Sequence, residues 1–225
     1  MNERDKAILN NLTKFRCMSR DQIAKLSFST LKNPINSCNS VLKRMTRDKY
    51  IKASKVYTPY VYFPYESKIK PDSQKIPHFL ALVDAYIEIR AVREPKFMTI
   101  EPKYNASVEP DMFILLGEQP LFIEIQRSQY TEKVMSEKIQ RYEEYYFSNE
   151  WQGEAWQKEE RKVFPAILII TPTRYAIKSE LKIYQAPSIT EFFGNMMNKQ
   201  PTKQQPSNTP KIRSNNTGSI KYRME

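Results

Sequence analysis

The sequence predicts an α+β protein in which a small, mainly helical unit precedes a larger unit of alternating helices and strands. Apolar residues recur at helical spacing through much of the first 50 positions, and an apolar hairpin occupies residues 108–126. Positive charge gathers at the two ends of the chain. The predicted divisions are a first unit at residues 1–66, a polar linker at 67–76, a second unit at 77–194 and a disordered basic tail at 195–225.

The charge of the chain is unevenly distributed around a formal total of +11. Residues 1–70 hold 15 Lys/Arg against 5 Asp/Glu (net +10), residues 71–194 hold 15 against 19 (net −4), and residues 195–225 hold 6 against 1 (net +5). Concentrated positive charge is the electrostatic footprint of a polyanionic partner. We therefore expect nucleic-acid binding; a basic surface without a specific partner is the alternative.

Composition argues against several classes of protein. There is no apolar run of about 18 residues and no apolar secretion core at the start, so we expect a cytoplasmic protein without a membrane partner. Only 4 glycines and no GxxxxGK[ST] argue against a phosphate-binding loop. Cys17 and Cys38 are spaced too far apart for a CxxC zinc site. His78, the sole histidine, is expected to cap or pack a helix, which excludes enzymes that need a histidine pair.

Three helices are predicted in the first unit. Residues 5–15 have helical spacing, and Ser19 with Gln22 forms a capping box for a second, short helix. Asn33-Pro34 begins a third helix that runs to about residue 48. Ile35, Val41, Leu42 and Met45 are expected to face inward on that helix.

Two short β-prone runs follow, at residues 55–57 and 60–63, and complete the order of a winged helix-turn-helix. The third helix would lie in the major groove of duplex DNA, where Asn reads adenine and Arg or Lys reads guanine. Lys52 and Lys55 on the hairpin would contact phosphates. The expected base-reading face is Asn36, Asn39, Ser40, Lys43, Arg44 and Arg47. A winged helix that contacts protein is the alternative.

The second unit is predicted to run helix, three strands, helix, strand. Pro77 opens the first helix, residues 96–103 form a strand, and the hairpin supplies two more. The helix at residues 131–147 has an apolar stripe of Met135, Ile139, Tyr142 and Tyr146. Residues 163–171 read as a strand buried on both faces, and residues 181–186 as a further strand. Ser188 caps a last helix.

The hairpin carries carboxylates on its buried side. A four-residue loop, Gly117 to Pro120, would pair Leu116 with Leu121, so that Phe113 faces Glu124 and Asp111 faces Gln126. Asp111, Phe113, Glu124 and Gln126 would then share one face, because side chains alternate along a strand. Two acids on an apolar sheet need a cation or a donor as a partner, and a divalent metal is one such partner.

Pro110-Asp111 followed by Glu124-x-Gln126 resembles the PD-(D/E)XK nuclease motif, with glutamine where that family usually has lysine. The run EPDMFILL…LFIEIQRS…KIQRYEEYY also resembles the replication-relaxation family of plasmid and phage proteins, over roughly residues 5 to 195. This resemblance implies a winged helix followed by a nuclease-like αβββαβ domain. The predicted helix and strand order supports the motif independently.

An active nuclease would use Asp111 and Glu124 to hold Mg²⁺ or Mn²⁺, with Glu101 or Glu88 as a third ligand. Gln126 is neutral and cannot stabilise developing charge as lysine does. Lys138 would reach in from the following helix, either as the missing lysine or as an ion-pair partner of Asp111 or Glu124. In the second case the site is structural and free of metal.

Two functions follow from these patterns. The first is a double-stranded DNA-binding protein of a plasmid, phage or conjugative element that controls replication or transcription. Its nuclease-like body would serve as a platform for a second copy of the chain or for replication or conjugation proteins. The alternative is a Mg²⁺- or Mn²⁺-dependent DNA endonuclease or nickase that uses Asp111 and Glu124.

Overall fold

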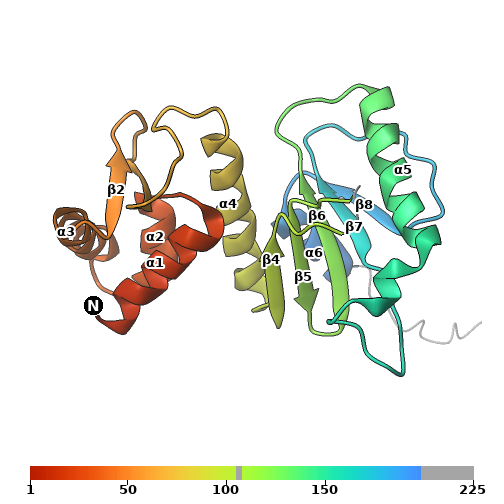
Figure 1. The fold of residues 1–225 in the computed structure, drawn as a ribbon, viewed down its shortest axis with the longest axis horizontal. Coiled ribbons are helices and arrows are strands. Elements are labelled where there is room, and N and C mark those ends of the chain that lie inside the picture. Colours follow the sequence, from red (N-terminus) through yellow and green to blue (C-terminus); the bar gives the residue numbers. More distant parts are fainter. Residues whose placement is uncertain (105–107, 199–225) are drawn as a thin grey trace, which may run out of the picture.

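The computed structural model describes residues 1–104 and 108–198; most of the predicted basic tail lies outside the described residues. Within them the chain forms a mixed α+β structure of six α-helices, one 3₁₀ helix and two sheets. Figure 1 shows two lobes with a long helix, α4, between them.

The first lobe contains the three predicted helices and a small antiparallel sheet. The capping box at the second helix is present, since the Ser19 hydroxyl accepts from the Gln22 N–H and the Gln22 side chain accepts from the Ser19 N–H. The elements are α1 (Glu3–Phe15), β1 (Met18–Ser19), α2 (Arg20–Ser27), α3 (Pro34–Arg47), β2 (Ile51–Ser54) and β3 (Val61–Pro64). The strand order is β1-β3-β2.

Two predictions for this lobe were wrong in detail. The first hairpin strand is β2 at Ile51–Ser54, not residues 55–57, because fully buried Ile51 pairs with Pro64 while Val56 is 67% exposed. On α3 the inward position expected for Ile35 belongs to Cys38, which is fully buried, whereas Ile35 lies at the exposed N-terminal turn.

The second lobe has the predicted element order. The elements are α4 (Ile76–Val92), β4 (Phe97–Ile100), β5 (Met112–Leu116), β6 (Gln119–Ile125), α5 (Glu132–Ser148), the 3₁₀ helix η1 (Glu150–Gly153), β7 (Ala166–Ile170), β8 (Ile183–Ala186) and α6 (Ile189–Asn198). The five strands follow the order β4-β5-β6-β7-β8. Pairs β4–β5 and β5–β6 are antiparallel, and pairs β6–β7 and β7–β8 are parallel.

Helices cover both faces of this sheet. Met112, Ile114 and Ile123 face the cluster that contains the buried side chains of α4 and α6. Phe113 and Phe122 face the opposite cluster, under α5. Alternation along β5 and β6 therefore serves two cores at once, although burial on both faces was predicted only for residues 163–171. The buried stripe of α5 is Met135, Ile139, Tyr142 and Tyr145, so Tyr145 takes the place predicted for Tyr146.

The hairpin register differs from the prediction by two residues. Leu116 pairs with Gln119 and Phe113 with Phe122, so the turn is only Gly117-Glu118. Gly117 has φ +65°, a conformation that costs other residues about 1 kcal/mol. A shift of two preserves the face of every side chain. Asp111 and Glu124 thus remain on a common face, and they now lie opposite each other, one step beyond the last pair, Met112 with Ile123.

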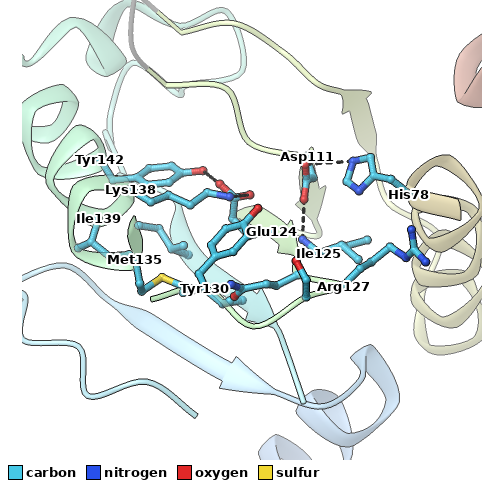
Figure 2. Close-up of a pocket in the computed structure, with 14 residues that line it drawn as sticks. His78, Asp111, Glu124, Ile125, Arg127, Tyr130, Met135, Lys138, Ile139 and Tyr142 are labelled. Carbon is cyan, nitrogen blue, oxygen red and sulfur yellow. Dashed lines mark hydrogen bonds and ion pairs between the residues drawn. The ribbon is translucent and has the colours of Figure 1, made fainter. Parts of the chain in front are cut away.

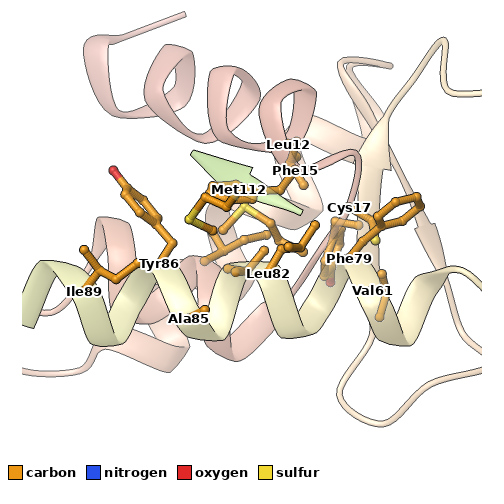
Figure 3. Close-up of a cluster of buried hydrophobic side chains, with 14 of the residues drawn as sticks. Leu12, Phe15, Cys17, Val61, Phe79, Leu82, Ala85, Tyr86, Ile89 and Met112 are labelled. Atoms are coloured by element: carbon orange, nitrogen blue, oxygen red, sulfur yellow. The ribbon is translucent and has the colours of Figure 1, made fainter. Parts of the chain in front are cut away.

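The segment predicted as a linker is bonded back to the first lobe. The Ser54 hydroxyl donates to the Pro71 carbonyl (2.8 Å), and the Lys52 ammonium donates to the Ser67 carbonyl. Helix α4 packs against the first lobe as well as against the rest of its own lobe, and Figure 3 shows its side chains in one cluster with Phe15 of α1 and Met112 of β5. Buried Gln22 of α2 adds hydrogen bonds to Leu80 and Asp84 of α4. The hydrophobic core is therefore continuous between the lobes.

Candidate functional site

The predicted carboxylates converge on a hollow where β5 begins and β6 ends, under the first turns of α5 (Figure 2). A cavity of about 150 Å³ lies here beside a wider one of about 500 Å³. Asp111, Glu124, Tyr130, Lys138 and Tyr142 line both cavities. The hairpin and the helix that follows it therefore build one pocket, as the sequence predicted.

Glu124 lies at the bottom of this pocket and is 2% exposed. Its Oε2 accepts from the Lys138 ammonium, and its Oε1 accepts from the Tyr142 hydroxyl at 2.5 Å. Lys138 and Tyr142 are four residues apart on α5, so they project from the same side of the helix. Of the two roles considered for Lys138, the structure shows that of an ion-pair partner, with Glu124.

Burial dominates the electrostatics of Glu124. It raises the pKa of this carboxyl to about 7, and the nearby charge of Asp111 acts in the same direction, against Lys138. For Lys138, burial acts to lower the pKa, but the attraction of Glu124 and Asp111 prevails and the pKa lies above its usual value. Glu124 is almost entirely buried, so its charged form depends on the Lys138 ammonium for stabilisation.

Asp111 is bound from the other side by His78, near the start of α4. His78 Nε2 lies 3.3 Å from Asp111 Oδ1, and Asp111 Oδ2 accepts from the Ile125 N–H at 2.6 Å. The hydrogen bond to Asp111 raises the pKa of His78, with a smaller contribution from Glu101. The sequence placed His78 at a helix start but gave it only a cap or packing role. No local pattern links the residue to the hairpin.

Glu101 is the third predicted ligand, and it is held by the first lobe. Its carboxylate pairs with the Arg16 guanidinium, and its Oε1 lies 4.0 Å from His78 Nε2. Its backbone has φ +46° and is held by a hydrogen bond from its N–H to the Asp111 carbonyl at 3.0 Å. Each of the three carboxylates thus has its own basic partner from a different helix or loop.

These partners make the pocket a poor fit for Mg²⁺ or Mn²⁺. Both ions need carboxylate oxygens that are free to coordinate, and here Lys138, His78 and Arg16 each already contact one of the three acids. Across residues 1–104 and 108–198, no three His, Cys, Asp or Glu side chains are grouped closely enough to hold a metal. Glu88, the alternative third ligand, instead accepts from Thr190 of α6.

Gln126, which the motif resemblance aligned with a lysine, is 8% exposed. Its Nε2 donates to the Tyr175 hydroxyl at 3.0 Å, while its Oε1 has no hydrogen-bond partner among the described residues. The Tyr175 hydroxyl also accepts from the Tyr130 N–H at 2.9 Å. Gln126 therefore ties the end of β6 to the loops around it.

The predicted DNA-contact residues of the first lobe fall into two groups. The exposed ones on α3 and the adjoining loop are Asn36, Asn39, Ser40, Lys43, Arg47 and Lys55. Of these, Arg47 also pairs with Asp48 at 2.8 Å. The other two predicted contacts, Arg44 and Lys52, are held by the protein itself. Arg44 Nη2 lies 2.7 Å from Asp5 Oδ2, and Lys52 donates to the Ser67 carbonyl. Since Asp5 is 1% exposed, Arg44 has a structural task that its spacing on α3 did not reveal.

A groove of about 420 Å³ separates α3 from the β2–β3 loop. Asn39 and Lys43 line it from α3, and Lys55 and Tyr60 line it from the loop. Three of these four residues are among the predicted DNA contacts. The groove therefore brings together a polar face of α3 and the β2–β3 loop, which are separated in the sequence.

Comparisons of the chain with protein-family models, with curated proteins and with solved structures found no match. Among the helices of residues 1–104 and 108–198, none has the length and apolar character needed to cross a bilayer.

Proposed function

We propose that this chain is a double-stranded DNA-binding protein that controls replication or transcription of a plasmid, phage or conjugative element. In this proposal the first lobe is a winged helix-turn-helix with α3 as its recognition helix. The second lobe is a PD-(D/E)XK-like domain whose carboxylate pocket has become structural. It would act as a platform for a second copy of the chain or for replication or conjugation proteins.

The observation that carries this proposal is the groove between α3 and the β2–β3 loop, in the lobe with most of the positive charge. Residues 1–70 have a net charge of +10, and Lys43 and Lys55 have no salt-bridge partner within the described residues. Free ammonium groups beside an exposed asparagine suit a DNA groove with phosphates at its rim. The charge-compensated pocket of the second lobe supports a role other than cleavage.

Replacing Asn39 and Lys43 together with alanine should weaken binding to a cognate duplex by about 1–3 kcal/mol for the base contact of Asn39, with a further, salt-dependent loss for the phosphate contact of Lys43. Both side chains are exposed on α3, so the fold should not change. The probe is obtained by sequencing the duplex fragments that the protein retains from genomic DNA. Affinity is then measured by gel shift at fixed salt, because phosphate contacts make affinity salt-dependent.

Lys25→Ala is the matched control for this experiment. Lys25 is exposed on α2 and lies outside the groove lining, so its loss changes the charge of the lobe without changing the α3 face. A small, equal effect of Lys25→Ala and of the Asn39/Lys43 variant would mean that only net charge matters. That result would contradict a recognition role for α3.

The second candidate function is a metal-dependent DNA endonuclease or nickase. It is favoured by one observation: Glu101, Asp111 and Glu124 all line the same cavity of about 500 Å³. We expect supercoiled plasmid to stay intact when it is incubated with the protein and Mn²⁺, because each carboxylate is already paired. Nicking by the wild type that disappears in Glu124→Gln would reverse this order of the two functions.

A further inference from the structure

The groove between α3 and the β2–β3 loop has an apolar floor. Ala53 and Tyr62 line it from the small sheet, and Pro59 from the loop. Tyr62 is 8% exposed, whereas Tyr60 at the edge of the groove is 44% exposed. This apolar floor favours an apolar part of a ligand, whereas the charged helix face beside it favours anionic groups.

The position of Tyr60 is set by the surrounding backbone. The Arg20 N–H, at the start of α2, donates to the Tyr60 carbonyl at 2.9 Å. The next residue, Val61, is fully buried and pairs with both Ser19 and Ser54. The ring of Tyr60 is therefore carried on a segment that three elements hold in place, and its exposed area is available to a ligand at little ordering cost.

Cations surround this apolar surface. Lys43 from α3, Lys55 from the loop and Arg20 from α2 all line the groove, although Arg20 is also paired with Asp21 at 2.8 Å. A phosphate on the floor itself would lose its water and gain few donors, which is unfavourable. The flat face of a base loses little hydration free energy on this floor, and it can stack on a tyrosine ring. The lysines suit the phosphates on either side of that base.

We infer that this groove accepts an unpaired DNA base, stacked on Tyr60, while Lys43 and Lys55 contact the flanking phosphates. The inference rests on the proposed function, because it assumes that the first lobe binds DNA. It goes further by naming the form of DNA. Within a duplex the faces of each base are covered by its neighbours, so the Tyr60 ring gains a stacking partner only at a melted, forked or single-stranded position.

The test compares three probes that share one duplex: a blunt form, a form with a short single-stranded extension, and a form with an extension of equal length made of abasic residues. The last two carry the same phosphates and differ only in bases. Fluorescence anisotropy at fixed salt should show on the order of tenfold tighter binding to the base-bearing extension than to the abasic one. A 2-aminopurine in the extension should be quenched on binding.

Variants at one position locate the effect. Tyr60→Phe keeps the ring and should keep the preference and the quenching. Tyr60→Ala and Tyr60→Leu should lose both, so that each variant binds the base-bearing and the abasic extensions with equal affinity. Thermal unfolding checks the fold, and Tyr60→Leu preserves apolar bulk if the alanine variant is unstable.

The outcomes separate this inference from the proposed function. Blunt-duplex binding with equal affinity for the base-bearing and abasic extensions would overturn the unpaired-base site and leave the DNA-binding role intact. A preference that survives in Tyr60→Ala would also overturn it, since the stacking would lie elsewhere. Failure to bind any of the three probes would overturn both.

Discussion

Replacing Lys138 with methionine is expected to lower the free energy of unfolding by about 3 kcal/mol at pH 8. Glu124 is 2% exposed, and Lys138 is its ion-pair partner, so the variant leaves a buried carboxylate with only the Tyr142 hydroxyl. Methionine keeps most of the aliphatic volume of lysine, so packing changes little. Urea unfolding followed by circular dichroism measures the loss.

The loss should depend on pH. Burial raises the pKa of Glu124 from an ordinary 4.5 to about 7. A carboxyl with a raised folded-state pKa contributes stability that is complete below its unfolded pKa and is lost as pH rises through the folded value. Removal of Lys138 moves this pKa further up. Above about pH 7 the stability of the wild type therefore no longer falls, whereas that of the variant continues to fall. The difference between the two proteins should therefore grow from pH 5 to pH 8.

Two further variants make this prediction specific. Lys133→Met removes the same charge from the same helix, but Lys133 is 85% exposed and lies 4.0 Å from Glu137, so the cost should stay below about 1 kcal/mol. Glu124→Gln in the Lys138→Met background removes the unpaired charge and should recover most of the loss. Equal costs for Lys138→Met and Lys133→Met at pH 8 would show that the Glu124 pair is not a buried one.

Replacing Arg44 with alanine is expected to lower the free energy of unfolding by about 2 kcal/mol. The Asp5 carboxylate is 1% exposed, and its other oxygen, Oδ1, has no hydrogen-bond partner among the described residues. Arg44 is 38% exposed, so part of the lost interaction is replaced by water and the cost stays below that of a fully buried pair. Equilibrium unfolding in urea measures it.

Lys43→Ala is the control at the neighbouring position. Lys43 is exposed and is expected to change stability by less than about 0.5 kcal/mol while it weakens DNA binding. Asp5→Asn should rescue Arg44→Ala, because it removes the buried charge. If Arg44→Ala is as stable as Lys43→Ala, the arginine is free to contact DNA after all, and its pairing with Asp5 carries little weight.

The local elements were readable from the sequence because their causes are local. Helical spacing marked α1, α3 and α5, and the Ser19–Gln22 box marked the start of α2. The hairpin shows both the reach and the limit of such reasoning. Alternation placed Asp111 and Glu124 on one face correctly, whereas the register was two residues off, because a two-residue turn at Gly117 also satisfies the pattern.

The charge partners needed the tertiary structure. Arg44 and Asp5 are 39 positions apart, and nothing in the helix pattern of α3 indicates that one of its basic residues turns inward. The same holds for His78 with Asp111 and for Arg16 with Glu101, which join the first lobe and α4 to the hairpin.

By itself, the sequence determined the order of helices and strands, the separation of basic from acidic regions, and the face of the hairpin that carries its acids. These follow from periodicity, which is a pattern among nearby residues, and from composition, which is a total over a region of the chain. Only the tertiary structure decided that Glu101, Asp111 and Glu124 each have a base beside them, and that α3 and the β2–β3 loop enclose a groove. Those features arise when distant segments pack, since Coulomb attraction and burial depend on distance in space and not along the chain.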